Sequence, residues 1–237
     1  MFEIIFPSIA GVASLSLFAL IFGLILSYAK LKLKVDKDPR MGVDNVPGGV
    51  AMTARVMCRG GRHEAASKFF YEGPKSCKAA KSIMGGFKVC EYGCLGFGDC
   101  SNVCPFGAIT MAGTNLPAID KDKCTGCGNC AAECPKHIIQ LVKKDADVYI
   151  MCSNTDKPAA MKLGCTVGCT GCKLCVKACS EVFKDNADID SAIEVNDFLA
   201  RIDYAKCINC LKCAEACPVP VINPLSVAKK FNKSRIS

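Results

Sequence analysis

The longest apolar run of the chain lies near its first residue. Residues 4–29 carry no charged side chain, Glu3 precedes them, and three lysines follow between residues 30 and 34. A helix of these 26 residues would be about 39 Å long, which exceeds the roughly 30 Å hydrocarbon core of a bilayer. A cleaved signal peptide is disfavoured, because it would start with basic residues and have a shorter apolar stretch. The pattern favours a membrane helix within residues 1–34 over a buried core helix, and the lysines predict that the chain beyond them is cytoplasmic.

The remainder of the chain has only short apolar runs. Residues 35–52 contain prolines and glycines without a periodic pattern, which is typical of a linker. Beyond the linker, pairs of short apolar runs flank turn residues, a pattern that predicts hairpins. The elements expected there are hairpins at 108–120 and 193–203, a short helix between Cys127 and Cys134, and closing strands at Ile138–Val142 and Val221–Ile222.

Twenty of the 237 residues are cysteines, and their spacing indicates the chemistry. Three runs share the pattern C-x2-C-x2-C-x3-C, beginning at Cys124, Cys169 and Cys207, and a variant run C-x3-C-x5-C-x3-C begins at Cys90. In bacterial ferredoxins the first three cysteines of such a run bind one cubane cluster, and the fourth binds the other. Zinc sites usually use separated C-x-x-C pairs, and disulfide frameworks belong to small secreted domains. The spacing therefore predicts at least four 4Fe–4S clusters.

Pairing successive runs assigns sixteen cysteines to four clusters. The expected ligand sets are Cys90, Cys94, Cys100 and Cys134; Cys104, Cys124, Cys127 and Cys130; Cys169, Cys172, Cys175 and Cys217; and Cys179, Cys207, Cys210 and Cys213. The other four cysteines are either buried thiols or the ligands of a fifth cluster or another metal site. They are Cys58, Cys77, Cys152 and Cys165.

The cysteine-rich part reads as an internal duplication. Val56-Met57-Cys58 matches Ile150-Met151-Cys152, and the segment from Cys90 to Cys94 matches the segment from Cys165 to Cys169, with Phe97 in the place of Cys172. The fold class that follows is α+β, with two tandem bacterial-type two-cluster ferredoxin units after the membrane helix. We place the first unit, with an N-terminal extension, at residues 53–150 and the second at residues 151–237. Because such units are small, we expect metal binding and folding to be coupled.

The formal charge of +8, from 30 basic and 22 acidic residues, does not indicate nucleic-acid binding. Ligating thiols are deprotonated, so four clusters would contribute about −8 and nearly neutralise the chain. Residues 59–89 are locally basic, with seven Lys or Arg against two Glu. This segment is either a solvated face or a docking face for an acidic redox partner.

No G-x-G-x-x-G motif follows a strand, and no Walker-type or haem-attachment motif is present in the sequence. Since the chain has no recognisable nicotinamide or flavin site and no acid–base constellation, we expect no catalytic residues. The chain should carry electrons, while partner subunits carry out the bond-making chemistry.

The chain resembles the B subunits of Rnf complexes over the expected helix and about residues 53–222. The resemblance lies in the apolar N-terminal run and in the segments CEYGCLGFGDCSNVCPFGAI, CTGCGNCAAECPK, GCTGCKLCVKAC and CINCLKCAEACP. The resemblance implies an electron-transfer subunit of an ion-translocating, membrane-bound ferredoxin:NAD+ oxidoreductase, with soluble ferredoxin as donor and Na+ or H+ as the pumped ion. It also implies a single-pass protein of the bacterial inner membrane, with lipid, other membrane subunits and an NAD-binding subunit as partners. One membrane helix without an intramembrane charge would leave ion movement to those subunits.

In one respect the sequence departs from this pattern. Members of the family carry a further cluster domain after the helix, whereas residues 1–57 contain no cysteine. Two other functions stay open from the sequence. The chain could be the iron–sulfur subunit of another membrane oxidoreductase, of the formate dehydrogenase or hydrogenase type, or a free-standing membrane-tethered polyferredoxin.

Overall fold

The structure is a computed structural model, and it describes residues 51–185 and 190–224. The expected membrane helix, and nearly all of the expected linker, lie outside the described residues. Within the described ranges, no helix is long and apolar enough to cross a membrane.

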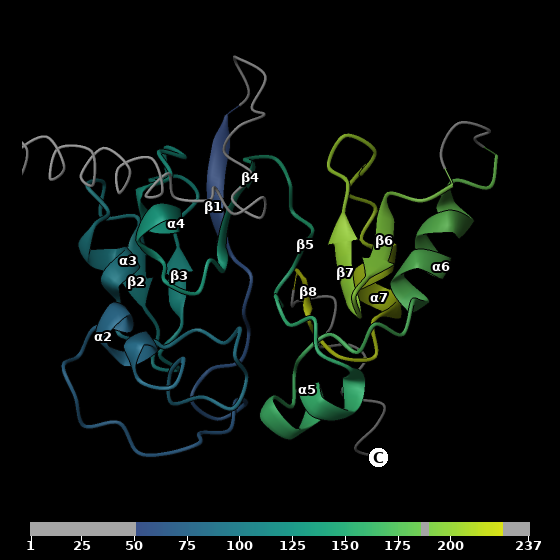
Figure 1. The fold of residues 1–237 in the computed structure, drawn as a ribbon. Helices are drawn as coiled ribbons and strands as arrows, with labels where there is room; N and C mark the ends of the chain where they lie inside the picture. Colours follow the sequence, from purple (N-terminus) through teal and green to yellow (C-terminus); the bar gives the residue numbers. More distant parts are fainter. Residues whose placement is uncertain (1–50, 186–189, 225–237) are drawn as a thin grey trace, which may run out of the picture. The chain divides into compact units, whose positions relative to one another are not determined.

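The first half is built on an outer strand pair that encloses a hairpin in sequence (Figure 1). Strand β1 (Met52–Val56) pairs antiparallel with β4 (Ile139–Lys143), so that Val56 lies opposite Ile139. Between them come α2 (Cys77–Ser82), α3 (Asp99–Asn102), the hairpin of β2 (Ile109–Met111) and β3 (Pro117–Ile119), and α4 (Asn129–Glu133).

The second half repeats this order. Strand β5 (Tyr149–Ile150) pairs antiparallel with β8 (Ile222–Asn223). Between them come α5 (Pro158–Gly164), α6 (Leu174–Val182), the hairpin of β6 (Ile193–Asn196) and β7 (Leu199–Ile202), and α7 (Lys212–Ala216). The second half runs from green to yellow in Figure 1, where β6 and β7 stand next to α6 and α7.

The predicted hairpins, the short helix before Cys134 and both closing strands are confirmed to within a residue or two. The common order of strand, two helices, hairpin, helix and strand confirms the α+β duplication. Strand β5 belongs to the second outer pair although it precedes residue 151, because its partner is β8.

Each half has a small core in which cysteines hold many of the buried positions. In the first half, Ala54, Ile109, Ile138 and Ile139 pack with three buried cysteines, which are Cys94, Cys100 and Cys130. In the second half, the strand residues pack with four buried cysteines, which are Cys169, Cys175, Cys179 and Cys213. Since so much of each core is thiol, its integrity depends on what the thiols bind.

Candidate iron–sulfur centres

Each cysteine run bends through two residues of left-handed backbone conformation. In the Cys124 run these are Gly126 (φ 73°) and Gly128 (φ 81°), which flank Cys127. The same positions are left-handed in the other two regular runs, at Gly171 and Lys173 and at Asn209 and Leu211. The repeated turn curls the backbone, so that the first three cysteines of a run line the same cavity or stand close together.

The variant run contains the same turn without its central cysteine. Gly96 (φ 79°) and Gly98 (φ 82°) flank Phe97, which stands where a regular run has a ligand. The ring of Phe97 packs instead against Tyr71 and Phe87, with centroid distances of 5.4 and 5.8 Å. The loop fold is therefore kept, while one thiol has to come from elsewhere.

Two of the four expected cysteine groups line one cavity each. Cys169, Cys172, Cys175 and Cys217 face a common cavity beside Val195 and Ala200. Cys104, Cys124, Cys127 and Cys130 face another beside Ala54 and Leu141. These are the third and second expected ligand sets.

The fourth expected group also stands together. Cys179 and Cys213 are buried in the second core, with Cys207 packed against it. Burial raises the pKa of Cys207, the backbone N–H of Asn209 lowers it, and the nearby Cys179 and Cys210 thiols raise it again. The backbone N–H of Ala192 donates to Cys179 Sγ at 3.3 Å.

The first expected group changes in one member. Cys94, Cys100 and Cys134 line a cavity with Cys77, the first residue of α2, and the structure does not bring Cys90 to it. Asp99 orients that end of α2, because its Oδ2 accepts from Ser76 Oγ at 2.9 Å and from the Lys78 backbone N–H at 3.2 Å. The spacing of the motif gave no sign of Cys77 or Asp99, since neither ligand spacing nor a repeat marks the α2 region.

Cys90 lies instead with the remaining three cysteines. Cys58, Cys90, Cys152 and Cys165 line one cavity, together with Met151 and Met161. Cys77, the fourth cysteine outside the runs, does not line this cavity, because α2 carries it to the other one. All twenty cysteines lie in the described ranges, and all are free thiols there.

Burial strongly favours the neutral form of most of these thiols. It raises the pKa of Cys100, Cys152, Cys175 and Cys213 to about 12 and that of Cys130 to about 11. Cys124 differs: burial raises its pKa, but the backbone N–H groups of Ala54 and Gly126, together with Thr53 and Arg55, lower it overall. A cation that replaces the proton on such a thiol removes a large desolvation cost, so these cavities suit iron better than free thiolates.

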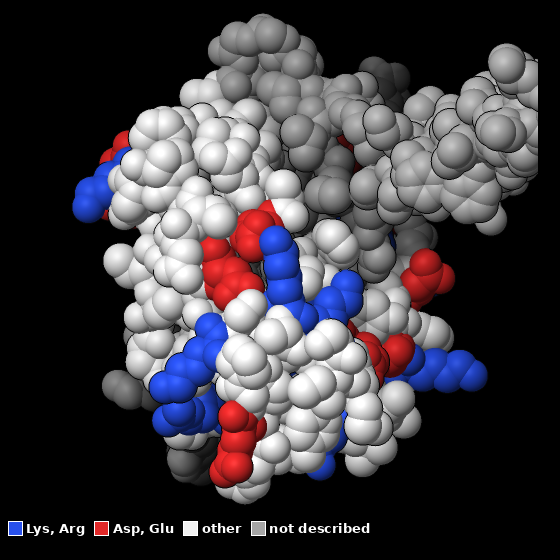
Figure 2. All heavy atoms as spheres, turned by 60° about the vertical axis from the view of Figure 1, so that its left-hand side comes forward, with Lys and Arg blue, Asp and Glu red and all other residues white. Residues whose placement is uncertain are grey.

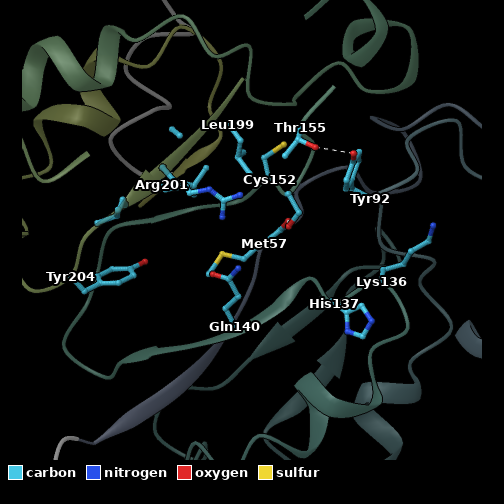
Figure 3. Close-up of a pocket in the computed structure, with 14 residues that line it drawn as sticks. Met57, Tyr92, Lys136, His137, Gln140, Cys152, Thr155, Leu199, Arg201 and Tyr204 are labelled. Atoms are coloured by element: carbon cyan, nitrogen blue, oxygen red, sulfur yellow. Dashed lines mark hydrogen bonds between the residues drawn. The ribbon is translucent and has the colours of Figure 1, made fainter. Parts of the chain in front are cut away.

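A larger cavity of about 220 Å³ opens beside Cys152 (Figure 3). Its lining comes from both halves and includes Met57, Gln140, Arg201 and Tyr204. At its edge Thr155 Oγ1 donates to Tyr92 Oη at 2.8 Å, the contact drawn as a dashed line. No other thiol lines it, so it is not a further four-cysteine group.

The basic segment of residues 59–89 is less uniform than its sequence indicates. Lys68 pairs with Glu91, Lys78 Nζ lies 2.7 Å from Glu133 Oε1, and Lys88 is buried. Arg62, Lys75 and Lys81 are exposed and form no ion pair within the described ranges. Figure 2, turned toward the side of Figure 1 on which α2 and α3 lie, shows basic and acidic side chains interspersed.

Residues 90–138 and residues 168–221 each match the family described as a 4Fe-4S dicluster domain. Together with the four-cysteine groups, these matches define the chain as an iron–sulfur protein with two tandem dicluster domains. It holds several 4Fe–4S clusters, about four to five, and its function is electron transfer.

Three relatives carry the resemblance further. The chain is 37% identical to the B subunit of the Na(+)-translocating ferredoxin:NAD(+) oxidoreductase complex of Acetobacterium woodii, over 73% of this chain and 50% of the relative. It is 38% identical to the B subunit of the ion-translocating oxidoreductase complex of Methanosarcina acetivorans, over 70% of this chain and 60% of the relative. It is 40% identical to the B subunit of the proton-translocating ferredoxin:NAD(+) oxidoreductase complex of Clostridium ljungdahlii, over 73% and 58%. The resemblance to such B subunits is confirmed, and the matched part of this chain spans 50–60% of their lengths.

Proposed function

We propose that the chain is the multi-cluster electron-transfer subunit of an ion-translocating ferredoxin:NAD+ oxidoreductase complex. The observation that carries this proposal is the 37–40% identity to three B subunits over 70–73% of the chain. The cofactors fit the residues present, because three groups of four thiols line a cavity each, and in the fourth group Cys207 and Cys213 each lie near Cys179 and Cys210.

The proposed ligand sets keep three of the expected groups and revise one. Cys77, Cys94, Cys100 and Cys134 hold the first cluster, with Cys77 in place of Cys90; this revision is supported by their common cavity. The second set is Cys104, Cys124, Cys127 and Cys130, the third is Cys169, Cys172, Cys175 and Cys217, and the fourth is Cys179, Cys207, Cys210 and Cys213. When bound, cubane clusters supply one-electron chemistry, and the chain contributes ligands, burial and hydrogen bonds that tune their potentials.

The proposal also covers the electron-transfer partners of the chain and its location in the cell. Reduced soluble ferredoxin is the electron donor, and the electrons leave toward membrane subunits and an NAD-binding subunit. The chain itself contributes no nicotinamide or flavin site, and other subunits move Na+ or H+. A helix within residues 1–34 anchors it to the bacterial inner membrane, with the cluster-bearing part in the cytoplasm.

Anaerobic purification in mild detergent, with identification of the associated subunits, tests the complex. We expect an NAD-binding subunit and several polytopic membrane subunits to co-purify, and membranes from a deletion strain to lose ferredoxin-dependent NAD+ reduction. Co-purification with a formate dehydrogenase or hydrogenase subunit would contradict the proposal. So would a chain that purifies alone while the membranes keep their ferredoxin-dependent activity.

A further inference from the structure

Three thiols outside the cysteine runs share one cavity between the two dicluster units with Cys90, the first thiol of the variant run. We propose that Cys58, Cys90, Cys152 and Cys165 hold a fifth 4Fe–4S cluster that links the first unit to the second. The proposal depends on this cavity and not on the complex in which the chain works. Each unit contributes two of the ligands, so neither unit could form the site alone.

The internal repeat supplies the ligands as two equivalent pairs. Cys58 follows β1 and Cys152 follows β5, at matching positions of the duplication, and Cys90 matches Cys165 in the same way. Their hydrogen bonds repeat as well. The backbone N–H of Cys94 donates to Cys58 Sγ at 3.4 Å, and the backbone N–H of the equivalent Cys169 donates to Cys152 Sγ at 3.3 Å. The two units therefore present the same donor arrangement to one site.

Backbone contacts hold the two pairs against each other. Residues Glu64 to Ala66 bridge the chain before Cys90 and the chain around Cys165: Val89 N–H donates to Ala66 O at 2.9 Å, and Ala66 N–H donates to Gly164 O at 3.0 Å. Gly60 lies between two of the thiols, since a Cβ there would stand 3.1 Å from Cys165 Sγ and 3.9 Å from Cys58 Sγ. A side chain at this position would crowd the Cys165 sulfur.

The surroundings of the site favour an anionic occupant. Lys88 is 6% exposed, and its ammonium group donates to the neutral carbonyl of Gly60 at 2.7 Å, directly beside the thiols. Asn154 is 3% exposed, and its side-chain amide donates to Cys90 Sγ at 3.3 Å. A buried cation and a buried amide donor are both stabilised by negative sulfur, and a cubane with four thiolates carries a charge of about −2.

The arrangement suits a cubane better than zinc or a disulfide. In the described ranges, no three His, Cys, Asp or Glu side chains converge tightly enough to hold a single ion. A cubane spreads its four thiolates over four irons and needs no such convergence, whereas zinc gathers all four on one ion. None of these thiols forms a disulfide in the structure.

The site adjoins one cluster cavity in each unit. Cys94 lines the cavity of the first proposed cluster and donates its backbone N–H to Cys58; Cys169 lines the cavity of the third and donates to Cys152. A cluster held here makes a continuous row of one-electron carriers through both units. One electron passes at a time, the donor centre is oxidised as its neighbour is reduced, and no bond or proton needs to move.

Iron content of the full-length, anaerobically purified protein tests the proposal. We expect about 20 irons per chain in the wild type, at four per cubane, and about 16 in Cys152→Ser. Met161→Leu is the matched control, because it changes a buried side chain of the same cavity without removing a thiol. It should keep the full iron content.

A second substitution separates this site from the first cluster. Cys77→Ser alone should also lose about four irons, and Cys77→Ser combined with Cys152→Ser should lose about eight, because the two thiols serve different clusters. An equal loss in the single and double variants would mean that the two cysteines share one site, and would overturn the proposal. Wild-type iron content in Cys152→Ser would also overturn the proposal. The same holds if the wild type contains one zinc per chain and Cys152→Ser contains none.

Two further measurements cover the remaining outcomes. If Cys152→Ser does not fold, Cys90→Ser and Cys165→Ser provide the same measurement from the other pair. Electron paramagnetic resonance of the reduced wild type then counts the cluster spins. We expect five spins per chain, and four would contradict the proposal. A wild type with about 16 irons and no response to any of these three variants refutes the fifth cluster, but leaves the proposed function in place.

Discussion

Several cysteine sulfur atoms of this protein accept hydrogen bonds from nitrogen donors. Backbone N–H groups donate to Cys58, Cys124, Cys152 and Cys179 at 3.3–3.4 Å, and Cys90 receives the side-chain amide of Asn154. Such donors stabilise the more negative, reduced state of a cluster and so raise its potential. Asn154 is the one of these donors that a substitution can remove without touching the backbone.

The first prediction concerns Asn154. Asn154→Asp is nearly isosteric, and it keeps the acceptor for the backbone N–H of Asp156, now 2.7 Å from Asn154 Oδ1. It replaces the donor to Cys90 Sγ with a carboxylate, so we expect one cluster potential to fall while the iron content stays unchanged. Potentiometric titration followed by electron paramagnetic resonance measures this shift.

The matched control for this prediction is Asn196→Asp. It adds the same charge at an exposed position of β6. It should leave every potential close to that of the wild type. An unshifted potential in Asn154→Asp, or an equal shift in the control, would show that the amide does not tune a cluster.

At the scale of elements, the two hairpins and the two closing strands followed from the sequence, because short apolar runs around turn residues report local structure directly. The pairing of each closing strand with β1 or β5 joins distant parts of the chain, and it was not predicted. The first three cysteines of each regular run could be grouped from the sequence, because they are close in the chain. The cavities of Cys77 and Cys90 could not be predicted, because no fixed spacing marks those segments. Phe97 showed where the variant run has no cysteine, and the position of α2, whose Ser76 and Lys78 donate to Asp99, supports Cys77 as the proposed substitute.

A glycine in the cysteine runs provides a test at this scale. Gly126 has φ 73°, and a Cβ there would stand 2.8 Å from both the Cβ and the carbonyl oxygen of Met52 on β1. Gly126→Ala should therefore destabilise the holoprotein by about 1–2 kcal/mol from backbone conformation alone, with the steric clash adding to this. The rate at which denaturant bleaches the visible cluster absorbance should rise several-fold.

Gly113→Ala is the control for that measurement. A Cβ at Gly113 would meet nothing within 4 Å, and the residue is not left-handed. Its bleaching rate should match that of the wild type or fall slightly, since alanine restricts the unfolded chain. Equal rates for both variants would mean that the close approach of the loop to β1 does not limit stability.

For the molecule as a whole, the segment of residues 59–89 exposes both charge and apolar surface. Arg62, Lys75 and Lys81 are exposed, and so are Phe70 (98% exposed) and Met84 (74%). Lys68 and Lys78 are paired with acidic residues and Lys88 is buried, so the cations unpaired within the described ranges, which a docking face for an acidic donor would use, are Arg62, Lys75 and Lys81. Steering by such charges acts mainly on the association rate.

Charge reversal tests this docking face. Arg62→Glu, Lys75→Glu and Lys81→Glu together should slow reduction by an acidic ferredoxin about tenfold at low salt, and the effect should vanish near 1 M salt. Stopped-flow reduction is the measurement. A small neutral reductant should act at the wild-type rate.

The matched triple variant reverses Lys157, Lys162 and Lys177, which are exposed in the second half. It carries the same charge change and should reduce the ferredoxin rate much less. If both triple variants respond alike, the effect is one of net charge, and residues 59–89 do not form the docking face.

The cavity shared by Cys58, Cys90, Cys152 and Cys165 also bears on how such a chain could evolve. A single dicluster unit carries half a site, in the form of Cys58 and Cys90 or of Cys152 and Cys165. Two identical copies that met face to face would complete it, each giving the same two ligands, as in an isologous dimer. The fused chain thus has the ligand arrangement of a homodimer closed around a common cofactor. Gene fusion would have made that pairing permanent and left each copy free to diverge, as Phe97 and Cys172 have done at equivalent positions.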